Sequence, residues 1–158
     1  MKRENLVKLL ISIVICELAG AVGSIYTTSA IKGWYNFLNK PSFNPPNWIF
    51  GPVWTTLFVL MGISLYIIWS KGLDKKENKI AVYVFAGQLV LNVFWSVLFF
   101  GFHSPVFAFV EIIFLWLAIL WTIIKFYKIS KTAAYLLFPY ILWVSFASVL
   151  NLFIAILN

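Results

Sequence analysis

The amino-acid sequence predicts an all-α integral membrane protein, in which five transmembrane helices form a bundle and a proline-rich loop between the first two helices forms a lid. Of its 158 residues, 63% are hydrophobic and 11% are charged, which leaves too little polar surface to cover a water-soluble domain of this size. The apolar residues gather in stretches of about 20, the length that crosses the hydrocarbon core of a bilayer as a helix. All but one of the connections between them are short, as in a helical bundle.

Five such stretches follow one another, and together they make the whole chain, residues 1–158, a single domain. They cover approximately residues 6–26, 47–69, 79–101, 105–127 and 133–157. The first follows a basic N-terminus, as in a secretory signal, but it continues past Glu17 without a small-residue cleavage site, so we interpret it as a retained helix. Cys16 is the only cysteine and by itself can form neither a disulfide nor a zinc site.

Prolines and small polar residues mark the expected helix ends and bends. Ser104 and Pro105 place an N-cap and a first-turn proline at the start of the fourth span, and Thr132 can cap the fifth. Pro52 and Pro139 lie inside apolar stretches, where each removes a backbone N–H donor. We therefore expect a bend or a shorter helix at these two prolines.

The first span carries small residues at four-residue spacing, which lets another helix backbone approach closely. They are Ser12, Cys16, Gly20 and Ser24. Packing within the chain is the favoured use of this stripe, and a contact between two copies is the alternative.

The basic residues divide unevenly between the two ends of the predicted helices. One side holds Lys2, Arg3 and Lys8 before or in the first span, Lys71, Lys75, Lys76 and Lys79 in the second loop, and Lys125, Lys128 and Lys131 around the fourth loop. Only Lys32 and Lys40, in the long first loop, lie on the other side. We expect a prokaryotic cell membrane, and in such a membrane the positive-inside rule predicts that the N-terminus lies in the cytoplasm and the long first loop and the C-terminus lie outside. Because these charges lie in loops, we do not expect nucleic-acid binding.

Five polar side chains lie within the predicted spans, where lipid offers them no hydrogen bonds. They are Glu17, Gln88, Asn92, Glu111 and Asn151. The three amides have two interpretations, either hydrogen bonding between helices that stabilises the bundle or ligand binding. The carboxyl groups favour a functional role, with a protonated structural Glu as the alternative.

Several of these residues share a membrane depth with tryptophans on other helices. At about 1.5 Å per helical residue, Trp54, Trp95, Glu111 and Asn151 lie at a similar distance from the outer helix ends. Residues three or four positions apart share one helix face. Three spans carry polar or aromatic residues at this spacing: Gln88, Asn92 and Trp95 on the third, Phe107 and Glu111 on the fourth, and Trp143, Ala147 and Asn151 on the fifth. If these faces converge, they form an aromatic cavity suited to a flat, largely apolar ligand.

The long first loop, residues 27–48, is expected to cover the outer mouth of this cavity. It contains Trp34 and Tyr35, followed by the proline-rich run 40–46. Because proline restricts the backbone, we interpret this run as a stiff lid and not as a mobile linker.

The order and spacing of several motifs carry a resemblance to a known family. These motifs are Trp34-Tyr35, Lys40-Pro41-Ser42 with Pro45-Pro46, Gly51-Pro52-Val53-Trp54, Met61-Gly62, Gly87-Gln88-Leu89 with Leu91-Asn92 and Trp95, Phe100-Gly101, and Pro139-Tyr140 with Trp143, Phe146-Ala147 and Leu150-Asn151. The chain resembles the translocator protein family, also called tryptophan-rich sensory proteins or peripheral-type benzodiazepine receptors, and looks like a prokaryotic-type member.

The resemblance implies a five-helix protein, often a homodimer, that binds porphyrins such as protoporphyrin IX and benzodiazepine-site ligands without a metal or another cofactor. The implied ligand-binding residues are Tyr35, Trp54, Asn92, Trp95, Phe107, Glu111, Trp143, Ala147 and Asn151. Some family members are associated with light-dependent porphyrin degradation, and the implied catalytic residues for that reaction are Trp54 and Trp143. Phe107 and Glu111 depart from the Trp and Asp of many animal members, and the C-terminal cholesterol motif is absent because Leu152 follows Asn151.

The leading functional hypothesis is therefore a membrane receptor or sensor for tetrapyrroles, with transport or photochemical degradation as further roles. The alternative is a small proton-coupled exporter of aromatic cations that uses Glu17. A structural assembly partner without a saturable ligand is a third hypothesis. His103, the only histidine, lies in an outer turn, which argues against a histidine-ligated haem.

Overall fold

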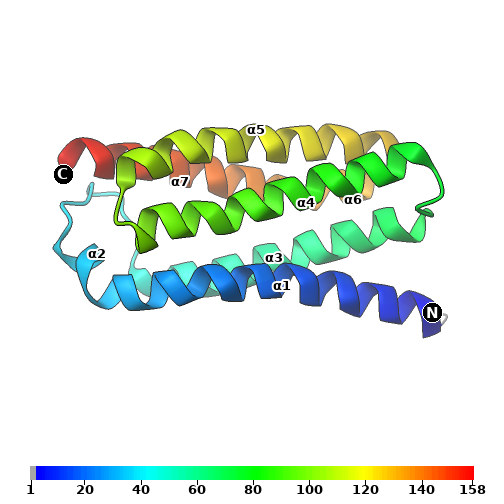
Figure 1. Cartoon of the computed structure of the whole chain (residues 1–158), viewed down its shortest axis with the longest axis horizontal. Coiled ribbons are helices and arrows are strands. Elements are labelled where there is room, and N and C mark those ends of the chain that lie inside the picture. The colour runs from blue at the N-terminus through cyan, green and yellow to red at the C-terminus, as the bar shows by residue number, and fades with distance from the viewer. Residues whose placement is uncertain (1–2) are drawn as a thin grey trace.

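A computed structural model describes residues 3–158 as a bundle of long helices (Figure 1). The elements are α1 (Arg3–Lys32), α2 (Trp34–Phe37), α3 (Asn47–Ser70), α4 (Lys76–Ser96), the one-turn π-helix η1 (Val97–Gly101), α5 (Pro105–Ile129), α6 (Lys131–Tyr135) and α7 (Phe138–Leu157). Five segments within these residues are long and apolar enough to cross a membrane: α1, α3, α4 with η1, α5, and α6 with α7. The prediction of a five-helix membrane bundle is confirmed, and the chain is a multi-pass membrane protein. Lys2, counted above for topology, lies outside the described residues.

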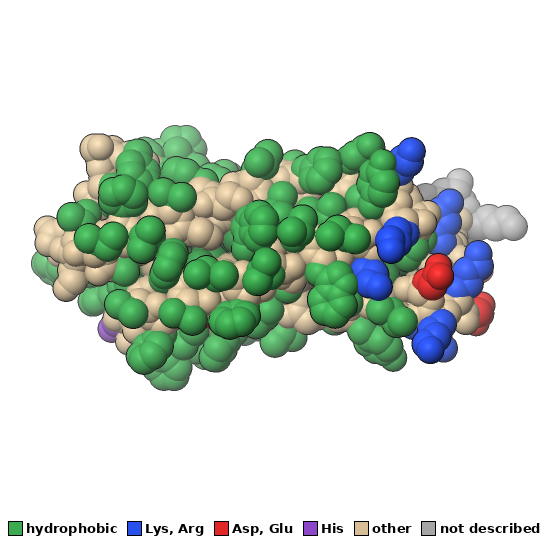
Figure 2. Space-filling model, turned by 90° about the horizontal axis from the view of Figure 1, so that it is seen from above, with side chains coloured by type: hydrophobic (Ala, Val, Ile, Leu, Met, Phe, Trp, Pro, Cys, Tyr) green, Lys and Arg blue, Asp and Glu red, His purple; other side chains and the backbone are tan. Residues whose placement is uncertain are grey.

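Charged side chains gather at one end of the bundle, and hydrophobic side chains cover the flank between the ends (Figure 2). The charged end holds the N-terminus, and we call it the basic end; the opposite end holds α2 and the C-terminus, and we call it the loop end (Figure 1). Large apolar side chains such as Val90 and Leu142 are more than two-thirds exposed on the flanks. This pattern fits a surface surrounded by lipid.

Helix α1 packs between α3 and α4, while α5 packs against α4 and α7 (Figure 1). Two glycines permit the close approach of α1 and α3. A Cβ atom added at Gly62 would lie 2.5 Å from the Cα of Ile13, and one added at Gly20 would lie 2.5 Å from the ring of Phe58. Close packing of small residues drives helix association in lipid. Three residues of the small-residue stripe, Ser12, Cys16 and Gly20, pack within the chain, whereas Ser24 is exposed.

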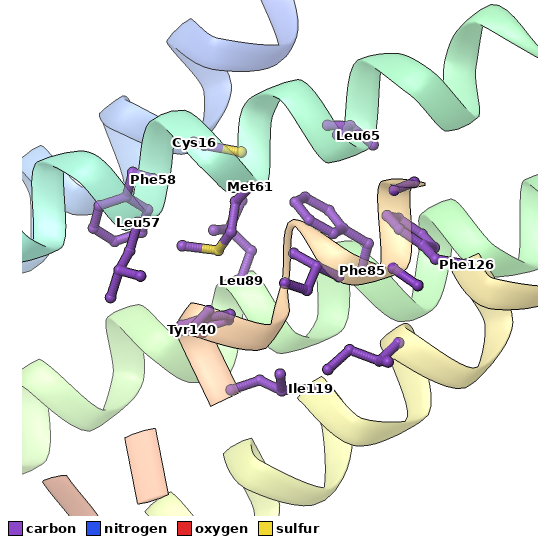
Figure 3. Close-up of a cluster of buried hydrophobic side chains, with 14 of the residues drawn as sticks. Cys16, Leu57, Phe58, Met61, Leu65, Phe85, Leu89, Ile119, Phe126 and Tyr140 are labelled. Atoms are coloured by element: carbon purple, nitrogen blue, oxygen red, sulfur yellow. The ribbon is translucent and has the colours of Figure 1, made fainter. Parts of the chain in front are cut away.

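A dense hydrophobic core fills the bundle near its middle and toward the basic end (Figure 3). Met61 and Leu65 of α3 face Phe85 of α4 there, and the rings of Phe85 and Phe126 stack 5.7 Å apart. Such packing leaves little room for a ligand in this half of the molecule. The free space lies toward the loop end.

Several predicted helix ends differ from those observed. Helix α1 continues to Lys32, beyond the predicted end at residue 26, and α2 takes up part of the predicted loop. The capping residue of α6 is Ser130, whose hydroxyl accepts a hydrogen bond from the Ala133 N–H, and not Thr132. Pro52 lies inside a continuous α3, whereas the fifth span breaks between α6 and α7, with Pro139 in the first turn of α7. A first-turn proline loses no helical hydrogen bond, which explains this position.

Candidate functional site

A cavity of about 380 Å³ lies in the loop half of the bundle. Seven of the nine predicted ligand-binding residues line it: Tyr35, Trp54, Asn92, Trp95, Trp143, Ala147 and Asn151. They come from α2, α3, α4 and α7, and α1 and η1 complete the wall. The structure therefore brings together residues that are far apart in the sequence, in a volume typical of small-molecule sites.

Paired aromatic rings form much of the cavity wall. The ring of Trp54 stacks on Phe58 at 5.6 Å, and Trp95 stacks on Phe99 at 5.1 Å. Trp143 meets Phe50 edge to face at 6.1 Å. Because each indole is braced by a neighbouring ring, the wall can present aromatic faces to a ligand with little rearrangement.

The amides on the wall are already engaged with other helices. The indole N–H of Trp95 donates to the side-chain oxygen of Asn151 at 3.0 Å, and the Asn151 amide donates to the carbonyl of Pro105 at 2.7 Å. Asn92 donates to the hydroxyl of Tyr140 at 2.9 Å, which in turn donates to Gln88 at 2.8 Å. Of the two interpretations for these amides, hydrogen bonding between helices describes all three, and Asn92 and Asn151 also line the cavity.

Glu17 lies on the cavity wall. From the sequence, it was assigned a role only in the alternative function, the proton-coupled export of aromatic cations. One of its carboxyl oxygens is buried and has no hydrogen-bond partner within residues 3–158. Glu17, Ala21, Ser24 and Thr28 follow a helical repeat along the cavity-facing side of α1. That repeat of small and polar residues is a signal visible in the sequence, and it marks a distinct face of α1 without showing that this face meets the cavity.

Phe107 and Glu111 do not line the cavity, which corrects their predicted placement. Both lie on a shallow groove between α4 and α5, where Phe107 is 67% exposed. Glu111 is buried, and neither of its carboxyl oxygens has a hydrogen-bond partner within the described chain. The reason for the error is that α5 packs behind α4 and α7, so equal depth in the bilayer did not bring its residues to the same cavity.

Tyr35 lines the cavity from α2 and is 3% exposed. Its hydroxyl donates to the side chain of Asn44 at 2.9 Å, and the Lys40 ammonium lies 4.9 Å from the centre of its ring. Burial raises the pKa of the Tyr35 hydroxyl to about 12, against the lowering effect of the bond to Asn44. The predicted lid is thus formed at the cavity by α2, because no residue of the proline-rich run 40–46 lines the cavity.

Metal-ligating side chains are scattered over the part of the chain that the structure describes. Within residues 3–158, no group of three His, Cys, Asp or Glu side chains is placed to hold a metal ion. His103 is exposed and stacks on Trp34 at 4.5 Å, and neither residue lines the cavity.

Comparison with known proteins adds independent information on ancestry. The model of the TspO/MBR family matches residues 12–157. The chain is 44% identical over 155 residues to the tryptophan-rich protein TspO of Chlorobaculum tepidum, covering 98% of each chain. It is 45% identical over 154 residues to the protein of that name in Archaeoglobus fulgidus, covering 98% of this chain and 99% of the relative. It is also 37% identical over 131 residues to the human translocator protein, covering 82% of this chain and 78% of the relative.

Proposed function

Because the chain belongs to the TspO/MBR family, we propose that it is a membrane receptor that binds flat, largely apolar tetrapyrroles such as protoporphyrin IX. Benzodiazepine-site ligands compete for the same cavity in this proposal. The observation that carries it is the convergence of Trp54, Trp95 and Trp143, from three helices, on one cavity. Stacking on indole faces and burial of apolar area favour a flat aromatic ligand over a compact polar one.

The dimensions of the cavity bear on how such a ligand is held. A cavity of about 380 Å³ is near the lower end of the range for small-molecule sites. In this proposal a macrocycle of four pyrrole rings fills the cavity, and part of its edge stays outside. The propionate groups of protoporphyrin IX stay outside, which avoids burial of their charge beside Glu17.

Light-dependent degradation is a further role of the same site in our proposal. It needs an indole in contact with the excited macrocycle, with dissolved dioxygen as the oxidant, and Trp54 and Trp143 are the two residues assigned to it. Without light the protein acts as a binding protein only. Two further expectations belong to this proposal: residence in a prokaryotic cell membrane with the N-terminus in the cytoplasm, and assembly as a homodimer.

A second candidate function is the proton-coupled export of aromatic cations, which the position of Glu17 on the cavity wall favours. Replacing Glu17→Gln separates the two candidates. An exporter loses pH-linked efflux from vesicles with this variant. A tetrapyrrole receptor keeps its porphyrin affinity, since the macrocycle is held by the indoles.

The test is a titration of tryptophan fluorescence with protoporphyrin IX, in darkness and under illumination. Wild type should show saturable quenching, weakened by Trp54→Phe and Trp143→Phe. Trp121→Phe is the matched control, because Trp121 is 54% exposed and does not line the cavity. Quenching that is equally strong in both cavity variants contradicts the site, and photoproduct formation that neither variant slows contradicts the photochemical role.

A further inference from the structure

The walls of the cavity differ in how exposed their residues are. Every lining residue from α2, α4, η1 and α7 is buried or half-buried. The exposed lining residues are Ala21, Ser24 and Thr28 on α1, and Asn47, Gly51 and Thr55 on α3. The open side of the cavity therefore lies between α1 and α3, and we call these six residues the seam.

The seam belongs to the flank of the bundle and not to its end. Toward the middle of the bundle, α1 and α3 are in tight contact at Gly62 and Gly20. Closer to the loop end, a Cβ atom added at Gly51 would meet nothing within 4 Å. Thr55 is eight residues from the start of α3, so the seam reaches about 12 Å along the helix from its loop end. That distance lies within one leaflet.

Two polar side chains of the seam, Ser24 and Thr55, can face lipid without an unpaired donor. The Ser24 hydroxyl donates to the carbonyl of Ala21 at 2.7 Å, and the Thr55 hydroxyl donates to the carbonyl of Gly51 at 3.0 Å. Hydroxyls that bond to their own helix are tolerated in hydrocarbon. The seam therefore consists of small, weakly polar side chains, whereas the exposed side chains on the rest of the flank are mostly large and apolar.

The loop end, by contrast, is held closed by several interactions. The Lys40 ammonium donates to the carbonyls of Tyr35 and Leu38 at 2.7 and 2.9 Å. Asn39 and Asn158 exchange two hydrogen bonds of 2.9 Å, each between the backbone of Asn39 and the side chain of Asn158. A ligand that entered from this end would have to break these bonds, whereas entry through the seam breaks none of them.

From these observations we infer that ligands enter and leave the cavity sideways, from one leaflet of the bilayer, through the seam between α1 and α3. The inference rests on the proposed function for the identity of the ligand. It assigns the ligand to a chemical class, amphiphilic flat molecules dissolved in the membrane. Their apolar ring passes Thr55 and Ala21, while their polar edge stays near Asn47 and Thr28 at the surface.

Matched threonine variants test this route. Thr55 and Thr56 are both exposed on α3, and each hydroxyl bonds to the carbonyl four residues earlier, but only Thr55 lines the cavity. In phosphatidylcholine vesicles, Thr55→Phe should slow both association and dissociation of protoporphyrin IX by about tenfold, because an obstructed passage raises one barrier for both directions. Thr56→Phe should leave both rates unchanged. A Thr55→Phe variant with unchanged rates, or with faster dissociation alone, overturns the inference.

The loop supplies the complementary test. Asn158→Ala removes its side-chain bonds with Asn39, and the sideways route predicts an unchanged association rate. Association that becomes several times faster in this variant overturns the inference, because it places the entrance at the loop end.

A measurement without ligand separates failure of the route from failure of the proposed function. Lipids with brominated acyl chains should quench the fluorescence of Trp54, because the seam exposes the Trp54 wall of the cavity to lipid. The contribution of Trp54 is the fluorescence that Trp54→Phe lacks relative to wild type. Absence of that quenching overturns the seam even if protoporphyrin IX binds. Quenching by brominated chains without saturable porphyrin binding retains the seam and overturns the tetrapyrrole function.

Discussion

The indole N–H of Trp95 donates a hydrogen bond of 3.0 Å to the side-chain oxygen of Asn151, joining α4 to α7 at the cavity wall. Asn151 also donates to the carbonyl of Pro105 at the start of α5. A single amide therefore connects three transmembrane helices. The position of the Trp95 ring, and with it one wall of the cavity, depends on this connection.

Asn151→Ala should lower the free energy of unfolding in detergent by about 1–2 kcal/mol, because interhelical hydrogen bonds in membranes contribute about this much or less and two are lost. The same variant should weaken porphyrin binding, since Trp95 loses its orientation. Val149→Ala on the same helix is the control, because Val149 is 49% exposed and does not line the cavity. Equal stability of Asn151→Ala and wild type would show that the amide is not a structural link.

Gly62→Ala should destabilise the bundle by about 1–3 kcal/mol, the usual penalty for overpacking. The added Cβ would lie 2.5 Å from the Cα of Ile13, and a backbone atom has less freedom to move away than a side chain. At Gly87, a Cβ would meet nothing within 4 Å. Gly87→Ala should therefore be neutral or stabilising through helix propensity. Thermal unfolding of both variants checks the contrast, and similar losses in the two would contradict it.

Raising the pH should weaken the attachment of α2 between about pH 10 and about pH 12. The pKa of the Tyr35 hydroxyl is about 12 in the fold and about 10 in an unfolded chain. Since the folded state holds this proton more tightly, the stabilisation is complete below pH 10 and is lost as the pH rises through the folded pKa. Tyr35→Phe should remove this part of the pH dependence, as measured by unfolding at several pH values. If stability depends on pH in the same way in Tyr35→Phe and in wild type, Tyr35 is not the source of this pH dependence.

Glu111→Met should leave porphyrin affinity within about twofold of wild type and raise stability by about 1–3 kcal/mol. Neither oxygen of the Glu111 carboxyl has a hydrogen-bond partner within residues 3–158, and an unsatisfied buried polar group costs about this much. Titration with protoporphyrin IX and unfolding in detergent measure the two effects. A large loss of affinity would return Glu111 to the binding site, where the family resemblance had placed it.

The sequence was sufficient for the membrane class and for the five helices, because span length and hydrophobicity are local properties of the chain. It also indicated an aromatic cavity, since Trp54 and Trp95 lie at a similar depth on their helices, with Trp143 somewhat deeper, and the family motifs include all three. Seven predicted residues do line one cavity. Depth along a helix follows directly from residue number, so these predictions needed no tertiary information.

Which helix faces meet was decided only by the tertiary structure. A helix that is apolar all round has no amphipathic face to orient it, so the sequence did not reveal that α5 turns Phe107 and Glu111 away from the cavity. Nor did it reveal that α1 contributes Glu17 to the wall, or that the open side lies between α1 and α3. These features depend on close contacts between distant segments, such as Gly62 with Ile13, and such contacts set the rotation and separation of helices that lipid leaves undetermined.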